Sequence, residues 1–405
     1  MREAEELLLA LYTVSMQGKS LKTDPEASSE LWADVLQLAQ WHQVLPLVFH
    51  AACTQPSFRN MDREKYLEYR ELSLQIYSRQ ILRTNEFLNL ILSLKDAGLD
   101  PVVLKGIVCR SLYPVPSLRP SVDEDLLIAP EEAGAYHAFL LSEGLFADEP
   151  EADAGEAEEL SYHRENSPTY IELHKHPFPR DAKAYGDYNE LFEGAMERTV
   201  KIQVEDVTLR TLCPTDHVLY LICHACKHFL HSGVGIRQMG DIVMFARAYG
   251  DAIDWEQVYA SCRRKHLERF AGAMLQIGQR YLGLEQVPAP FARLEVDCEA
   301  LLEDALSDGI YGAEDADRVH SSNLTLDAVA ASKQGRGKRG WLRSLFPGMG
   351  YMQGRYAYLR KLPWLLPAAW VQRLGEYLLR EKANPGRSLQ IGRERIELMR
   401  QYDLL

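Results

Sequence analysis

The chain has 405 residues, of which 46% are hydrophobic and 25% charged, and its formal net charge is −13. This composition is typical of a globular protein with a sizeable core, and the length fits roughly two or three domains. The acidic balance argues against a general nucleic-acid binder. No apolar run reaches the length of about eighteen residues that a membrane-spanning helix needs.

The N-terminus and the cysteines indicate the compartment. The opening residues, MREAEELLLALY, carry acids where a signal peptide has bases, and they fit an ordinary amphipathic helix. The 7 cysteines are odd in number and show no disulfide spacing, which fits a reducing environment. We therefore expect a cytoplasmic protein.

The N-terminal part of the chain is predicted to be helical. Apolar side chains recur at three- and four-residue spacing in residues 31–52 and 66–98. Gly98 fits the position that follows a helix end, and an Asp-Pro pair comes directly after it. Residues 1–98 are therefore expected to form an N-terminal helical region.

The pattern then changes to short strands between short helices. Strands are indicated by β-branched apolar runs that end in glycine or proline and, in the last of them, by strict alternation. The predicted elements are a strand at 101–106, a brief helix at 107–114, a strand at 121–130, a helix at 131–144, an acidic loop at 148–159 and a strand at 169–176.

Helical patterns return from about residue 186, after which a small hairpin is expected at 199–212 and strong helices at 216–233 and 237–250. The Ser-, Gly- and Lys-rich residues 322–341 are the expected flexible linker. The prediction is an α+β protein with a small mixed sheet flanked by helical regions. Its expected divisions are 1–98, a core at 99–185, a helical domain at 186–320 and a basic, aromatic-rich C-terminal helical segment at 321–405.

Three carboxylates carry the chemistry that the sequence predicts. Asp123 and Asp125 are two apart in one strand and therefore share a face. Parallel carboxylates repel each other unless a cation lies between them, and hard divalent ions such as Mg²⁺ or Mn²⁺ take oxygen ligands of this kind. Glu172 on a neighbouring strand can complete the cluster. Such a cluster suits phosphoryl or nucleotidyl transfer.

Lys105-Gly106, at the end of the first strand, is the candidate phosphate cradle. Glycine permits close approach of the backbone, the following helix N-terminus favours anions, and lysine supplies a point charge for phosphate.

Residues 104–128, LKGIVCRSLYPVPSLRPSVDEDLLI, followed by YIELHKH, resemble a bacterial family of uncharacterised nucleotidyltransferases within the DNA polymerase beta-like nucleotidyltransferase superfamily. The resemblance implies that Asp123, Asp125 and Glu172 are catalytic metal ligands and that Lys105-Gly106 is the phosphate loop. It also makes Arg119 a candidate phosphate contact. The implied reaction moves a nucleotidyl group from an NTP to a hydroxyl or phosphate acceptor. The candidate acceptors are a small molecule, a peptide, a sugar and a nucleic acid.

Two positions depart from the superfamily pattern. Lys105-Gly106 replaces the usual Gly-Ser pair, so the phosphate contact is expected to differ. Glu124 stands where a hydrophobic residue is usual, and we therefore expect the opposite face of this strand to be partly open.

Two clusters allow a metal interpretation beside a plainer one. His174 and His176 share the face of Glu172 by alternation, as zinc ligands or as histidines that hydrogen-bond a carboxylate. Cys223 and Cys226 fall on the apolar stripe of a predicted helix, and no second cysteine pair completes a metal site. Packed thiols are the favoured interpretation for the cysteines.

The helical domain adds candidate ligands for a nucleotide. His224 and His228 are four apart on one helical face and, with Lys227, can face a triphosphate or acceptor, or can simply be solvated. Arg237 and Asp241 are also four apart and can pair with each other. The resemblance gives Arg237 and Asp241 a role in ordering the site.

The C-terminal segment differs in charge from the rest of the chain. Between residues 328 and 375 there is no Asp or Glu, and Lys and Arg alternate with aromatic side chains. This mixture fits an anionic partner, with a membrane surface favoured, or a helical cap with solvated charges. The main alternative to an enzyme is a non-catalytic nucleotide- or partner-binding module on the same fold, and a zinc hydrolase is a distant third.

Overall fold

The computed structural model describes residues 1–231, 233–308, 356–379 and 385–405, together with isolated residues between 309 and 355. The N-terminal region is helical, as predicted. Its elements are α1 (Glu3–Met16), α2 (Ser29–Trp41), α3 (Leu45–Ala52), the 3-10 turn η1 (Pro56–Asn60) and the 34-residue α4 (Arg63–Asp96).

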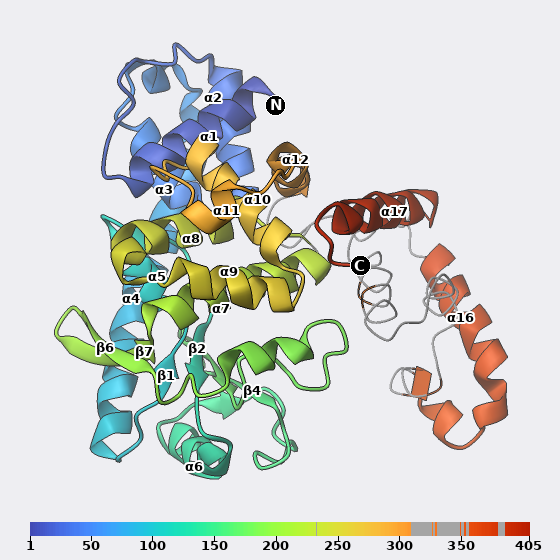
Figure 1. Cartoon of the computed structure of the whole chain (residues 1–405). Coiled ribbons are helices and arrows are strands. Elements are labelled where there is room, and N and C mark those ends of the chain that lie inside the picture. Colours follow the sequence, from blue (N-terminus) through green and yellow to red (C-terminus); the bar gives the residue numbers. More distant parts are fainter. Residues whose placement is uncertain are drawn as a thin grey trace.

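Side chains fix where two of these helices begin. Ser28 accepts a hydrogen bond from the Leu31 N–H, and Asp62 accepts from the N–H groups that open α4. Figure 1 shows α1–α3 gathered at one end of the molecule and α4 extending from them along the sheet. The long helix therefore connects the N-terminal bundle to the strands.

The sheet has 7 strands in the order β3-β4-β5-β2-β1-β7-β6. Its centre is mixed, because β2 runs parallel to β5 and antiparallel to β1, while β1 runs parallel to β7. The strands are β1 (Val102–Val103), β2 (Glu124–Leu127), β3 (Phe146–Ala147), β4 (Glu159–His163), β5 (Tyr170–His174), β6 (Thr199–Val204) and β7 (Val207–Leu212).

The sheet is wider than the sequence predicted. Strands β3 and β4 were not expected, and β4 begins at Glu159, the last residue of the predicted acidic loop. The predicted hairpin at 199–212 forms, and β7 pairs with β1, so the sheet continues past residue 185. Mixed helix and sheet agree with the α+β prediction, whereas the division into domains stays a prediction.

Helices cover the sheet and surround its central strands. The helices and 3-10 turns between β1 and β6 in the chain are α5 (Ile107–Arg110), η2 (Pro116–Leu118), η3 (Pro130–Glu132), α6 (Ala133–Ser142) and η4 (Gly186–Phe192). Those that follow β7 are α7 (Pro214–His231), α8 (Ile236–Tyr249), η5 (Gly250–Ala252), α9 (Trp255–Arg264), α10 (Glu268–Tyr281), α11 (Ala289–Ala292) and α12 (Cys298–Asp308). In Figure 1, α7–α10 lie between the N-terminal bundle and the sheet.

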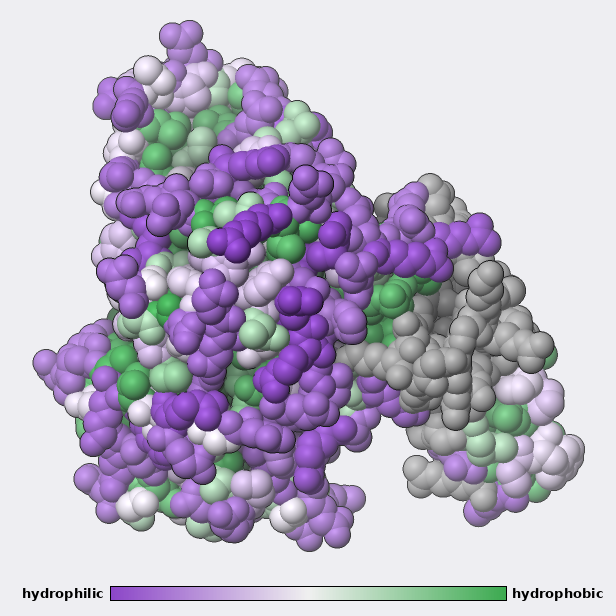
Figure 2. Space-filling view, in the orientation of Figure 1, coloured by the Kyte–Doolittle hydropathy of each residue, from purple (hydrophilic) through white to green (hydrophobic). Residues whose placement is uncertain are grey.

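The described C-terminal elements are η7 (Ala357–Arg360), η8 (Pro363–Leu365), α16 (Leu366–Leu379) and α17 (Pro385–Gln401). Arg395 of α17 donates to the backbone carbonyls of Phe229 and His231 at the end of α7, where a cation is favourable. Figure 2 shows the α16 region to one side of the main body, with apolar side chains on its surface. The predicted linker at 322–341 falls outside the described residues apart from isolated positions.

Two sequence predictions concern α7 and membrane spans. Cys223 and Cys226 are fully buried in α7, and the cluster of possible metal ligands found in the described part of the chain does not contain them. The packed-thiol interpretation fits this position. Among the described residues, no helix combines the length and the apolar character needed to cross a bilayer.

Candidate active site

Lys105 lies between the two aspartates of β2. Its Nζ is 3.2 Å from Asp123 Oδ2 and 3.2 Å from Asp125 Oδ1. Burial alone would lower the pKa of the Lys105 amine, but the charges of Asp123 and Asp125 outweigh it and hold that pKa well above its usual value. The sequence predicted that a cation must lie between these carboxylates, and in this structure the cation is the lysine ammonium.

Asp123 directly precedes β2 and faces the same side as Asp125, as alternation predicted. Burial would raise the pKa of the Asp123 carboxyl, but the charges of Lys105 and Arg237 lower it below its ordinary value. Asp123 is therefore ionised and held by Lys105.

Asp125 is buried, with a side chain only 1% exposed. Its Oδ1 interacts with Lys105 and lies 3.1 Å from His174 Nε2, whereas its Oδ2 is buried without a hydrogen-bond partner. A buried carboxylate oxygen that lacks a donor is costly, and such an atom calls for a cation or a ligand. This oxygen is the strongest local indication of a binding site.

Glu172 reaches the cluster because β5 runs parallel to β2 and places Glu172 beside Asp125. Burial raises the pKa of the Glu172 carboxyl; a hydrogen bond from His174 opposes this, and the charges of Asp125 and Asp123 add to the rise. Glu172 therefore lies beside Asp125, as the neighbouring-strand argument expected. Asp123 is not part of the group of possible metal ligands formed by Asp125, Glu172 and His174, and it is connected to Asp125 through Lys105.

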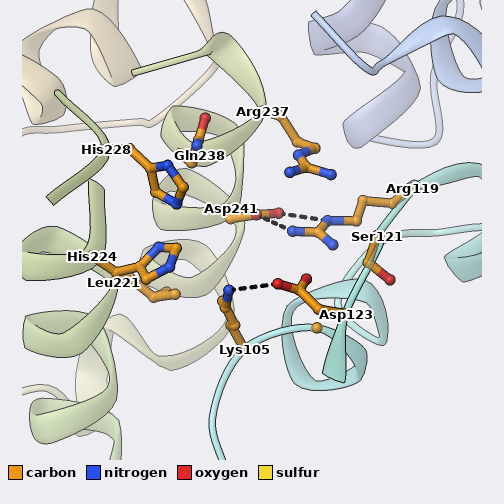
Figure 3. A pocket seen from close by; sticks show the side chains of 11 residues that line it. Lys105, Arg119, Ser121, Asp123, Leu221, His224, His228, Arg237, Gln238 and Asp241 are labelled. Atoms are coloured by element: carbon orange, nitrogen blue, oxygen red, sulfur yellow. Dashed lines mark hydrogen bonds and ion pairs between the residues drawn. The ribbon is translucent and has the colours of Figure 1, made fainter. Parts of the chain in front are cut away.

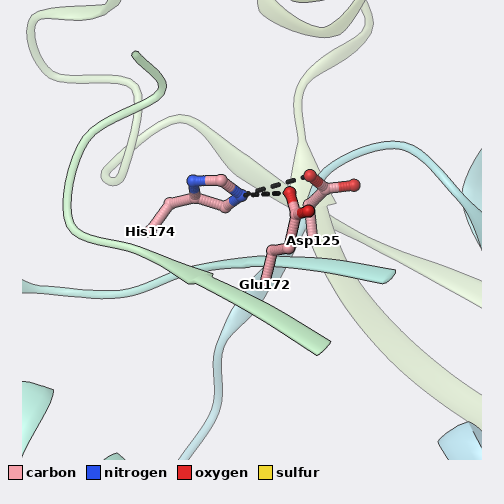
Figure 4. Close-up of side chains that lie close together, drawn as sticks. All are labelled: Asp125, Glu172 and His174. Carbon is pink, nitrogen blue, oxygen red and sulfur yellow. Dashed lines mark hydrogen bonds and ion pairs between the residues drawn. The ribbon is translucent and has the colours of Figure 1, made fainter. Parts of the chain in front are cut away.

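His174 joins the acids of three strands. Its Nε2 lies 3.1 Å from Asp125 and 3.5 Å from Glu172 (Figure 4). Its Nδ1 lies 3.2 Å from Glu159 Oε2 on β4. Burial would lower the pKa of the imidazole, but hydrogen bonds to Asp125 and Glu159 raise it well above its usual value. A charged imidazolium donates both of its protons and does not act as a metal ligand.

The donor set fits a hard divalent ion. Asp125, Glu172 and His174 each bring a possible ligand atom within 4.8 Å of the others. Both ring nitrogens of His174 face carboxylates, so the ligand atom that still lacks a partner is the Oδ2 of Asp125. Oxygen ligands of this kind favour Mg²⁺ or Mn²⁺ over zinc.

The zinc interpretation of Glu172, His174 and His176 is not supported by the geometry. Strand β5 ends at His174, so alternation no longer directs His176. His176 Nδ1 lies instead 3.0 Å from Glu158 Oε2, outside the cluster. The plainer interpretation of His174, as a histidine hydrogen-bonded to a carboxylate, fits the structure.

The expectation for Glu124 was wrong. Its side chain does face away from the aspartates, but it is fully buried, and this face is closed. Glu124 Oε2 accepts from the Ile107 N–H at 2.7 Å, and Oε1 accepts from Arg110 Nη2 at 2.7 Å. Glu124 is buried because its carboxylate bonds the first turn of α5 and so ties β2 to that helix.

Gly106 is required by this arrangement. Its φ is +56°, a backbone region that favours glycine, and a Cβ there would collide with the Glu124 carboxylate. The predicted close approach at Gly106 therefore occurs, with Glu124 as the group that approaches. Gly106 also lines the neighbouring pocket, so its predicted phosphate contact stays open to test.

A pocket opens beside Lys105 and Asp123, between the strand loops and helices α7 and α8 (Figure 3). Burial, followed by the charge of Lys105, lowers the pKa of His224 well below its usual value and that of His228 to about 3. Both rings are therefore neutral, with centroids 4.5 Å apart. The lining residues are Lys105, Gly106, Arg119, Ser121, Asp123, Leu221, His224, His228, Arg237, Gln238 and Asp241.

Asp241 pairs with Arg119 rather than with Arg237, although helical spacing allowed the second pairing. Arg119 Nε lies 3.0 Å from Asp241 Oδ1, and its Nη2 also contacts that carboxylate. Arg237 instead donates to the Pro120 carbonyl at 2.8 Å. The four-residue spacing was overridden because Arg119, from the loop before β2, reaches Asp241 in the buried interior.

Lys227 is not among the residues that line the pocket. Its ammonium lies 5.9 Å from the centroid of the Tyr185 ring. His224 and His228, one turn apart on the same helix, do face the pocket. Of the predicted site residues, Asp125, Glu172 and Lys227 do not line the pocket, and Asp125 is joined to it through Lys105.

Glu159 was missed by sequence reasoning. It stands opposite His174 in the antiparallel pairing of β4 with β5 and supplies the partner of His174 Nδ1. The signal was the alternation in ELSYH, residues 159–163, but the preceding run of acids hid the start of the strand. Recognising that strand would have placed Glu159 beside His174.

A family model described as "Uncharacterised nucleotidyltransferase" matches residues 28–283, which is more than half of the chain. The matched span contains the whole sheet, the carboxylate cluster, and helices α7 and α8. Neither a curated protein nor a solved structure matched the chain. Membership supports nucleotidyl transfer as the general activity, and the chain belongs to the family of uncharacterised nucleotidyltransferases.

Proposed function

We propose that this protein transfers a nucleotidyl group from an NTP to a hydroxyl or phosphate acceptor in a reaction that depends on Mg²⁺ or Mn²⁺. The observation that carries the proposal is the buried, unpartnered Oδ2 of Asp125 in a three-carboxylate cluster. The order of strand, Lys-Gly, helix, Asp-x-Asp strand and later acid also supports it, through its resemblance to the DNA polymerase beta-like superfamily.

The three carboxylates have separate roles in this proposal. Asp125 and Glu172 would hold the divalent ion, and Asp123 would hold the Lys105 ammonium beside it. When bound, the ion would stabilise negative charge on the reacting phosphoryl oxygens. Glu172, whose pKa burial raises, is the acid best suited to accept the proton of an acceptor hydroxyl.

The pocket beside the cluster would receive the triphosphate. Lys105 and Arg237 bring positive charge to it, and His224 and His228 bring neutral rings that can donate hydrogen bonds. Arg119, held by Asp241, keeps the loop before β2 against α8 and can add a phosphate contact. Gly106 lets the backbone approach that loop closely.

A non-catalytic binding module is the alternative, and one observation favours it. Lys105 already bridges Asp123 and the Oδ1 of Asp125, so these two acids share a counter-charge that is not a metal ion. Such a chain would bind a nucleotide or a partner through the same pocket without turnover.

Pyrophosphate release separates these two functions. The protein is incubated with each of the four common NTPs, with Mg²⁺ or Mn²⁺, and with pooled small-molecule, peptide, sugar and nucleic-acid acceptors. We expect release that needs both the metal and an acceptor. Tight nucleotide binding without release would support the binding module, and neither binding nor release would refute both.

The basic C-terminal segment is proposed to contact an anionic membrane surface. Trp364 is 72% exposed, and the neighbouring Leu362 is also exposed beside Lys361. A Trp364→Ser variant is expected to bind anionic vesicles more weakly than wild type. Added salt should weaken the binding of both proteins further. Equal vesicle binding by both proteins would remove this proposal.

A further inference from the structure

We propose that the Lys105 ammonium permanently occupies one of the two cation positions of the carboxylate cluster, so that the site takes one divalent ion and not two. This inference rests on the proposed nucleotidyl transfer. Lys105 Nζ is 3.2 Å from one oxygen of Asp123 and 3.2 Å from one oxygen of Asp125. An ammonium in this bridging position offsets the repulsion of the two acids, as a bridging metal ion would.

The cluster is divided into a filled half and an open half. On the filled side, Lys105 bridges Asp123 and the Oδ1 of Asp125. On the other side, the Oδ2 of Asp125 has no partner, and Glu172 lies beside Asp125 across the parallel strand pair. Only the second half presents a buried oxygen that is still without a donor.

The backbone on either side of Lys105 is anchored, so the ammonium is built into the fold. The Leu104 N–H donates to the Asp125 carbonyl at 3.1 Å, which ties this residue to β2 itself. The Lys105 carbonyl accepts from the Val108 N–H at 3.1 Å, at the start of α5. Gly106, next in the chain, is packed against Glu124. The lysine side chain therefore leaves from a fixed point beside the two aspartates.

Charge balance gives the same answer. The three carboxylates and Glu159 carry four negative units, and the Lys105 ammonium and the His174 imidazolium carry two positive units. The remaining formal charge of two negative units is one that a single divalent ion neutralises. Burial makes this balance important, because the Asp125 side chain is 1% exposed and that of Lys105 16%. Excess charge in such a place is costly. Lys105 also lines the pocket, so the same ammonium can face the triphosphate.

The test counts bound Mn²⁺ by electron paramagnetic resonance, with and without α,β-methylene-ATP, whose α–β linkage cannot be cleaved by transfer. Wild type is expected to bind one Mn²⁺ per chain in the complex. Lys105→Met, which keeps the length of the side chain and removes its charge, is expected to bind two. Without metal, Lys105→Met should also melt below wild type. Mn²⁺ should raise the melting temperature of this variant more than that of wild type.

Two variants control this measurement. Lys105→Arg keeps the positive charge and should still bind one Mn²⁺. Lys201→Met makes the same substitution on the exposed edge strand β6, three strands away from β2 in the sheet order, and should match wild type in every measurement.

The outcomes separate the inference from the function beneath it. Two Mn²⁺ ions in wild type would overturn the inference and leave the proposed transfer intact, and this count is decisive even if Lys105→Met does not fold. One Mn²⁺ in a folded Lys105→Met would also overturn it. If wild type binds neither Mn²⁺ nor the nucleotide analogue, the proposed function itself fails.

Discussion

The two faces of strand β2 carry buried carboxylates in opposite circumstances. On one face, Glu124 has both oxygens bonded, one to Arg110 and one to the Ile107 N–H. On the other face, Asp125 is equally buried, but its Oδ2 has no donor. Burial therefore does not distinguish a structural acid from a functional one. The difference lies in whether every oxygen already has a partner.

The closed face is saturated well beyond Glu124. Arg110 Nη1 also donates to Ser121 Oγ at 2.6 Å, and the Ser121 N–H donates to Gln80 Oε1 at 2.8 Å. Arg83 of α4 donates to the Pro168 carbonyl at 2.9 Å. This network fixes the loop before β2 against α4, so the open face can keep an unsatisfied oxygen on a rigid strand.

The largest expected effect follows from removing the open-face charge. Asp125→Asn should lower transfer about 10⁴-fold, which corresponds to ~5.5 kcal/mol, because the divalent ion loses a ligand. In EDTA the variant should also melt below wild type, since Lys105 and His174 lose the carboxylate that faces them. Like-charge repulsion alone would have predicted the opposite sign. Pyrophosphate release and thermal melting measure the two effects.

The control for this variant is Glu149→Gln, which removes an exposed acid from the loop before β4. It should keep both transfer and stability. If Asp125→Asn retained transfer within about tenfold of wild type, the unpartnered oxygen would not mark the metal site.

Substitution of Glu124 on the closed face should lower the free energy of unfolding. Glu124→Gln leaves the buried Arg110 guanidinium without its counter-charge, and removing one partner of a buried pair costs about 3–5 kcal/mol. Urea unfolding measures the change. The double variant Glu124→Gln/Arg110→Met should recover part of the loss, because no buried charge remains unpaired. A single variant within about 0.5 kcal/mol of wild type would show that this pair does not hold β2 to α5.

A buried base extends the comparison from acids to histidines. His217 is fully buried in α7, and burial lowers its pKa to about 3. Its folded pKa lies below the unfolded value, so the unfolded state takes up the proton first and stability falls as pH decreases from about 6.5 toward 3. At pH 5 this group should have lowered the free energy of unfolding by about 2 kcal/mol relative to neutral pH.

The measurement for His217 is urea unfolding at pH 7 and at pH 5, for wild type and His217→Gln. The variant's absolute stability can fall through lost packing, but its loss between the two pH values should be smaller than that of wild type. An unchanged pH dependence would show that His217 does not resist protonation in the fold.

The side on which each β2 acid lies could be predicted from sequence, because alternation in a strand depends only on backbone geometry. What surrounds those acids could not. Alternation places Asp123 and Asp125 together, but only the folded chain shows that Lys105 fills the space between them. Alternation also turns Glu124 away, and only α5 shows that this face is closed.

Long-range pairing accounts for the other differences. Helical spacing allowed Arg237 to meet Asp241, yet Arg119, far away in sequence, was the actual partner. Glu159 was assigned to a loop because local composition outweighed the short alternating strand that follows it. Local patterns thus predicted elements and the sides of strands, while tertiary neighbours determined the charge balance of the site.

The smallest expected effect concerns an acid that has spare partners. Asp241 is held by Arg119, and its Oδ1 also accepts from the Tyr113 hydroxyl at 2.9 Å. Tyr113→Phe removes one hydrogen bond and should lower the free energy of unfolding by about 1 kcal/mol. Nucleotide binding should barely change, because Arg119 still orients Asp241 and the loop before β2.

Arg119→Met, by contrast, leaves a buried carboxylate without its counter-charge and should weaken nucleotide binding together with stability. Calorimetric titration with an NTP and Mg²⁺ separates the two variants. Equal loss of binding in both would mean that Tyr113, which also lies 3.2 Å from the hydroxyl of Tyr12 in α1, positions the site as strongly as the ion pair does.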